Sequence, residues 1–160
     1  RVAKAINAKP KEIYFTSCGS ESDNLAIKGI AYANKHRGRH IITSKIEHPA
    51  ILNTCRSLER QGFNITYLNV DKNGFINLEE LENSIRVDTI LISIMFANNE
   101  IGTIEPIEKI ARIAKAVIIP FLEIKSSILK KLYDKSKTPT VRRIPPRIVS
   151  YGIIAKAPIK

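Results

Sequence analysis

The chain has 160 residues, enough for one domain with an ordinary hydrophobic core. Its two cysteines form neither a disulfide framework nor a metal-binding spacing, and no apolar run approaches the roughly 20 residues that span a bilayer. The net charge is +11, but residues 121–160 hold ten Lys and Arg against two acids, so most of the excess lies at one end.

Helical and strand-like patterns alternate along most of the chain. In chain order the predicted elements are helix 1–8, strand 12–17, helix 20–38, strand 40–44, helix 48–62, strand 63–70, helix 77–85, strand 88–96, helix 105–116 and strand 117–121. Ser20 followed by Asp23 resembles a capping box, which makes Ser20 the predicted N-cap. Pro49 lies in a first helical turn, and Gly74 marks a turn.

This alternation predicts an α/β fold with a mostly parallel sheet flanked by helices. Ligands of such open sheets bind at the carboxyl ends of the strands. We therefore look for chemistry in residues 17–20, 44–48 and 97–102, each of which follows a predicted strand.

The alternation ends after Phe121. Residues 122–133 predict at most a weakly amphipathic helix, and residues 135–147 combine prolines with basic side chains, which predicts an irregular or disordered segment. We accordingly divide the chain into a partial α/β domain, residues 1–121, and a divergent basic tail, residues 122–160.

Three of the strand ends carry candidate functional residues. Gly19 and Ser20 lie where a strand meets a helix N-terminus, which suits a phosphate, although local chemistry alone favours a well-capped helix. His48 opens the next helix and can stack on a flat ring, move a proton or cap the helix. Asn99 follows an apolar strand and can donate to a phenolate or carboxylate, or simply form a turn. His40, beside a basic turn, is predicted to be solvated.

A family resemblance rests on three segments: FTSCGSESDNLAIKG (15–29), IITSKIEHPAILNTC (41–55) and DTILISIMFANNEIGTIEPI (88–107). In this order they closely resemble the cysteine desulfurases, enzymes that use pyridoxal 5'-phosphate (PLP) and are related to the class-V aminotransferases. The resemblance covers residues 1–121 and implies a PLP-transferase large domain that is incomplete at both ends. It further implies conversion of L-cysteine to L-alanine, with the sulfur passing to an enzyme persulfide for iron–sulfur cluster assembly.

The resemblance also assigns roles to individual residues. Gly19 and Ser20 would hold the PLP phosphate, with Cys18 standing where the family has another glycine. His48 would stack on the ring and assist proton transfer, and Asn99 would lie near the ring oxygen and the substrate carboxylate. The implied partners are L-cysteine, sulfur-acceptor or scaffold proteins and a second copy in a homodimer. We expect a cytoplasmic location and no membrane segment, and nucleic acid is a disfavoured partner.

The family pattern breaks off after Phe121. Ile124 stands where an Asp should pair with the ring nitrogen, and Ser127 where a Gln should contact the ring oxygen. The Ser-Gly-His-Lys motif with the cofactor-anchoring lysine does not occur, and no cysteine follows Cys55. The sequence therefore predicts a truncated or frameshifted desulfurase that is inactive alone and of low solubility. The alternatives are a non-catalytic remnant that binds PLP or pairs with another subunit and, less favoured, a nucleic-acid binder acting through the basic tail.

Overall fold

The computed structural model describes residues 1–5, 9–115, 147–149 and 152–156. The predicted strand 117–121, the predicted helix 122–133 and the proposed domain boundary at Phe121 lie outside these residues, so they remain predictions. Within the described part of the chain, no helix has the length and apolar character needed to cross a membrane.

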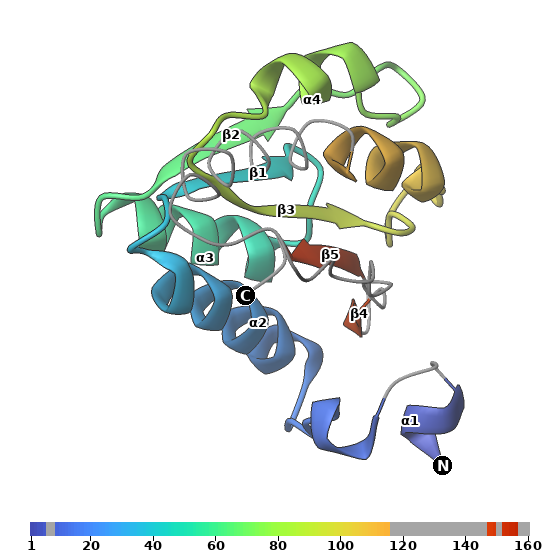
Figure 1. Cartoon of the computed structure of the whole chain (residues 1–160). Coiled ribbons are helices and arrows are strands. Elements are labelled where there is room, and N and C mark those ends of the chain that lie inside the picture. Colours follow the sequence, from blue (N-terminus) through green and yellow to red (C-terminus); the bar gives the residue numbers. More distant parts are fainter. Residues whose placement is uncertain (6–8, 116–146, 150–151, 157–160) are drawn as a thin grey trace, which may run out of the picture.

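A sheet of five strands forms the centre of the molecule, in the order β2-β1-β3-β5-β4 (Figure 1). Three strands are parallel, as the alternating pattern predicts: β1 (His40–Ser44), β2 (Asn64–Leu68) and β3 (Thr89–Met95). β5 (Gly152–Lys156) and β4 (Arg147–Val149) add antiparallel strands beyond β3. Arg147, the last residue of the segment predicted to be irregular, is thus in a strand, and the rest of that segment is outside the described residues.

Helices cover both faces of the parallel strands, because alternate strand residues face opposite sides. One face, with Ile41 and Leu91, packs against α2 (Gly19–Asn34) and α3 (Pro49–Glu59). The other face, with Ile42 and Ile92, packs against α4 (Leu78–Ser84) and the helix over 107–115, drawn in gold in Figure 1. The α/β prediction for the fold is therefore confirmed.

β3 is buried along its whole length, as β1 is. All seven of its residues are buried, with β1 on one side and β5 on the other. Five of the seven residues of its sequence, TILISIM, are apolar, because a strand covered on both faces has no solvent side. Its residues are therefore covered, and the low solubility expected of the chain alone stays a prediction.

The N-terminal segment differs from its prediction. α1 (Val2–Ala5) is one short turn of helix, and a 3₁₀ turn, η1 (Pro10–Glu12), follows it. Residues 12–17 were expected to form a strand, but residues 13–16 have no regular structure and pair with no strand among the described residues. Tyr14 and Phe15 are 77% and 84% exposed, so their β propensity is not realised.

The start of α2 also corrects the sequence analysis. The helix begins at Gly19, so Cys18 and not Ser20 is the N-cap residue, and its side chain makes no capping bond. The carboxylate of Glu21 accepts hydrogen bonds from the backbone N–H and the hydroxyl of Ser17, each at 2.7 Å. Cys18 has φ −161°, an extended conformation open to any residue, so replacing a glycine here causes no strain.

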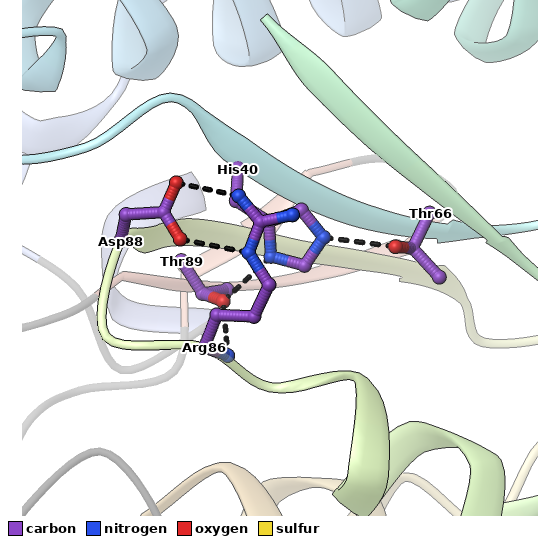
Figure 2. Close-up of polar contacts among 5 residues, drawn as sticks. All are labelled: His40, Thr66, Arg86, Asp88 and Thr89. Carbon is purple, nitrogen blue, oxygen red and sulfur yellow. Dashed lines mark hydrogen bonds and ion pairs between the residues drawn. The ribbon is translucent and has the colours of Figure 1, made fainter.

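His40 is the second correction, because its side chain is fully buried and not solvated. Figure 2 shows its ring between two hydroxyls: Nδ1 lies 2.7 Å from Thr89 Oγ1, and Nε2 lies 2.8 Å from Thr66 Oγ1. The nearby Arg86 and Asp88 form a salt bridge with an N···O distance of 2.7 Å. Burial, helped by the charge of Arg86 and opposed by Asp88, lowers the pKa of His40 to about 4.

Candidate functional site

At the carboxyl ends of the neighbouring parallel strands β1 and β3, the chain continues to opposite faces of the sheet. The chain leaves β1 for α3 on one face and leaves β3 for the helix over 107–115 on the other. Such a divergence is the place where open α/β sheets bind their ligands. The loops 45–48 and 96–106, which carry the predicted residues His48 and Asn99, begin there.

A hollow of about 380 Å³ lies between α2 and the start of α3. Its lining combines hydroxyl, amide, imidazole and ammonium groups from two helices: Ser20, Asn24, Lys28, His48, Pro49, Ala50, Asn53 and Thr54. The structure thus brings together Ser20 and His48, which are 28 residues apart in the sequence and were predicted separately as site residues.

The first turn of α2 presents free donors beside this hollow. The first helical bond runs from the N–H of Ser22 to the carbonyl of Cys18, so the N–H groups of Gly19, Ser20 and Glu21 precede the hydrogen-bonded part of the helix. These amides and the positive end of the helix dipole attract an anion. Gly19 is the first residue of the helix, and Ser20, exposed, adds its hydroxyl.

His48 is the N-cap of α3, which is one of the alternatives drawn from the sequence. Its Nδ1 accepts a hydrogen bond of 3.1 Å from the N–H of Ala50. Because Nδ1 is an acceptor, the neutral ring carries its proton on Nε2. The ring is exposed, lines the hollow and lies near the half-buried Asp23. Burial raises the pKa of the Asp23 carboxyl, and the nearby imidazole opposes that rise.

Two lining residues that the sequence analysis missed fit an anionic or polar ligand. Thr54 is 2% exposed, and its hydroxyl has no hydrogen-bond partner among the described residues. Lys28 adds a cationic side chain at the far end of the same helix face, since Ser20, Asn24 and Lys28 follow one another at intervals of four. That spacing was the signal in the sequence that could have revealed Lys28.

Asn99 does not line the hollow. It is exposed on the turn after β3, whereas its neighbour Asn98 is 8% exposed and fully engaged in hydrogen bonds. The structure therefore places Asn99 at the same edge of the sheet as His48, but on a separate loop.

Glu47, which the sequence analysis also passed over, is buried beside His48 at the end of β1. Its carboxylate is 6% exposed and accepts bonds from the N–H of Met95 and the hydroxyl of Ser44. Burial raises the pKa of Glu47 to about 7, although both hydrogen bonds oppose the rise. The charges of Asp23 and Glu105 raise it further.

The residues around the hollow fit the phosphate and ring of PLP. Helix amides and a serine hydroxyl suit the phosphate, and the exposed imidazole of His48 offers a flat surface to a ring. The buried hydroxyl of Thr54 makes no hydrogen bond to the described protein atoms, so it is available to a ligand. Across the residues that the structure describes, no cluster of three His, Cys, Asp or Glu could hold a metal ion.

Comparison with known proteins gives one consistent result. The sequence model of the family "Aminotransferase class-V" matches residues 1–138. A protein named cysteine desulfurase IscS from Clostridium botulinum is 61% identical over 121 residues, which cover 76% of this chain and 30% of that protein. One of the same name from Methanosarcina thermophila is 65% identical over 115 residues, 72% of this chain and 28% of the relative.

The solved structures agree with the sequence relatives. A structure titled as a NifS-like protein superposes with a TM-score of 0.69 at 49% identity, covering 72% of this chain and 32% of its own. Another, SspA in complex with cysteine, has a TM-score of 0.66 at 48% identity, covering 71% of this chain and 33% of its own. The chain thus spans about 30% of the length of the curated relatives that it matches.

Proposed function

The chain belongs to the class-V aminotransferase family, and we propose that it forms the phosphate-binding and ring-stacking side of a PLP-dependent cysteine desulfurase. The reaction would convert L-cysteine to L-alanine and pass the sulfur to a persulfide for iron–sulfur cluster assembly. The observation that carries the proposal is the shared hollow: Ser20 and His48 border it from the N-terminal turns of two different helices.

We propose a role for each site residue. When bound, PLP supplies an electron sink for the bonds around the substrate carbon. The first N–H groups of α2, beginning with Gly19, and the Ser20 hydroxyl would hold the phosphate. The ring of His48 would cover one face of the cofactor, and Asn99 would donate to the ring oxygen or the substrate carboxylate.

The hydrogen bond to Ala50 restricts what His48 can do with protons. With Nδ1 occupied as an acceptor, His48 donates from Nε2. A second proton on the ring would have to sit on Nδ1, which would break the helix cap. We therefore propose that His48 donates a hydrogen bond from Nε2 while it caps the helix, and that it releases the cap whenever the ring takes up a second proton to assist proton transfer.

The 160 residues do not by themselves supply every group that the reaction needs. No Ser-Gly-His-Lys motif occurs in them, Ile124 stands where the acid facing the ring nitrogen is expected, and no cysteine follows Cys55. We propose that this chain alone binds the cofactor without turning over L-cysteine. Sulfur acceptors and a second copy of the chain are proposed as partners in the complete reaction, and not in cofactor binding by this chain alone.

Binding of pyridoxine 5'-phosphate tests the site directly. This compound lacks the aldehyde and so cannot react with the many surface lysines. We expect it to bind more tightly than pyridoxine, and Ser20→Ala to weaken it about fivefold, the factor that about 1 kcal/mol gives. Ser57→Ala, on α3 and outside the hollow, is the matched control and should leave the affinity unchanged.

Two results would overturn parts of the proposal. Equal affinity for pyridoxine and its phosphate would show that the start of α2 is not a phosphate site. Alanine formation from L-cysteine by the purified chain with PLP, above the rate of PLP alone, would refute the statement that the chain is inactive by itself.

A further inference from the structure

Two side-chain hydrogen bonds tie the loop that carries His48 to the end of β3 and the turn that carries Asn99. Glu47 Oε1 accepts a bond of 2.7 Å from the N–H of Met95, the last residue of β3. In the opposite direction, Asn98 Nδ2 donates a bond of 2.9 Å to the carbonyl of Ile46. We call Glu47 and Asn98 the clasp.

Asn98 also shapes the turn that presents Asn99. Its Oδ1 accepts bonds from the N–H of Glu100 at 2.8 Å and of Ile101 at 3.0 Å. Its backbone N–H donates to the carbonyl of Thr103, closing the loop at 2.8 Å. The side-chain oxygen of Asn98 therefore holds the turn that carries Asn99. The side-chain nitrogen of Asn98 holds that turn against the loop that carries His48.

Glu47 occupies its position at an energetic disadvantage. It is 6% exposed, the nearby titratable groups include Asp23 on α2 and Glu105 after β3, and no salt bridge to it is found among the described residues. A buried carboxylate without a cation costs stability. Gln at this position would accept the same bonds from Met95 and Ser44 without the charge. The bonds, rather than ion pairing, are thus what Glu47 contributes to the described fold.

We infer that Glu47 and Asn98 are positioning residues that set the placement of His48 relative to Asn99 across the divergence between β1 and β3. The functional meaning of this placement rests on the proposed function, which assigns His48 and Asn99 to the cofactor. The clasp itself rests only on its two hydrogen bonds. One joins Glu47 to Met95, which are 48 positions apart in the sequence, and the other joins Asn98 to Ile46, which are 52 positions apart.

Substitutions that remove one bond at a time test the clasp. Asn98→Asp replaces the donor to Ile46 by an oxygen but keeps the acceptor for the turn. Glu47→Ala removes the acceptor for Met95, and Glu47→Gln, the matched control, keeps it. In the full chain, we expect Asn98→Asp and Glu47→Ala to weaken pyridoxine 5'-phosphate binding about fivefold, as the loss of about 1 kcal/mol does. Glu47→Gln should bind like the unmodified chain.

Nuclear magnetic resonance of the ligand-free chain separates positioning from mere stability. We expect the imidazole nitrogens of His48, the amide of Ala50 and the side-chain amide of Asn99 to shift together in Asn98→Asp and Glu47→Ala, and not in Glu47→Gln. If both variants lose unfolding free energy while these resonances stay in place, the clasp is only structural and the inference fails. If one variant does not fold, the other decides by the same resonances.

The same experiments keep the two proposals apart. If the unmodified chain does not bind pyridoxine 5'-phosphate, the proposed function fails, while the resonances of the ligand-free chain still decide the clasp. If it binds and the folded variants show unchanged affinity and unchanged resonances, the clasp fails and the proposed function stands.

Discussion

Lowering the pH should destabilise this protein through one buried side chain, His40. The ring is fully buried, with both nitrogens held by the hydroxyls of Thr66 and Thr89 at 2.7 to 2.8 Å (Figure 2). Arg86 lies close enough to disfavour a second positive charge, and Asp88 compensates only in part. Protonation would therefore place a charge where burial and a neighbouring cation both oppose it.

The size and sign of the effect follow from the two pKa values of His40. In the folded chain the pKa is about 4, against an ordinary value of 6.5. Because the folded state binds this proton less readily than the unfolded state, the stability is fully present above pH 6.5 and is lost as the pH falls toward 4. The difference between the two values corresponds to about 3 kcal/mol, and the loss ends below the folded pKa.

Urea denaturation of the full chain at a series of pH values between 7 and 4 measures this loss. Titration of the carboxyl groups also changes the stability over this range, so the relevant quantity is the difference between the unmodified chain and His40→Gln. That difference should fall by about 3 kcal/mol from pH 7 to pH 4. His36→Gln, at an exposed position, is the control and should show no such trend. A difference that stays constant over this range would refute the reasoning.

Three further predictions rest on other side chains. Burial raises the pKa of Glu47 from 4.5 to about 7, so its contribution to stability is fully present below pH 4.5 and is lost as the pH rises through 7. Glu47→Gln should therefore gain stability relative to the unmodified chain as the pH rises through 7, and no gain in urea denaturation would contradict this. Asn77 caps α4 by accepting from two backbone N–H groups, so Asn77→Ala should cost about 1 kcal/mol of unfolding free energy, and an unchanged urea midpoint would disprove the cap's contribution. Cys18 is exposed, whereas Cys55 is buried and its burial raises the pKa of its thiol to about 12. A thiol reagent should therefore label Cys18 in the folded chain and Cys55 only on unfolding. Equal labelling of both cysteines in the folded chain would contradict the fold.

The order of helices and parallel strands could be read from the sequence because it depends on local signals. Pro49 at the start of α3 and Gly62, with φ +83° after its end, punctuate the chain whatever surrounds them. The mostly apolar run of β3 indicates a strand covered on both faces. The motifs around Ser20, His48 and Asn99 indicated the family, which the comparisons confirm.

The errors arose where a neighbour decides the outcome. Residues 13–16 have β propensity, but a strand requires a partner, and the described residues provide none. Ser20 has the side chain of an N-cap, yet the N-cap of α2 is Cys18. The residues before the helix are held instead by Glu21, whose carboxylate accepts from the N–H of Ser17. His40 follows a basic turn, which indicated solvent, but β2 and β3 enclose it from both sides.

The sequence alone was thus enough to predict most of the helices and strands, the fold class and the residue types that suit a phosphate and a flat ring. Only the tertiary structure showed that Ser20 and His48 share one hollow, that Thr54 and Lys28 line it, and that Glu47 reaches Met95 across 48 residues. The physical reason is that helix and strand patterns act over a few residues, whereas these contacts depend on how two helices and two strand ends pack together.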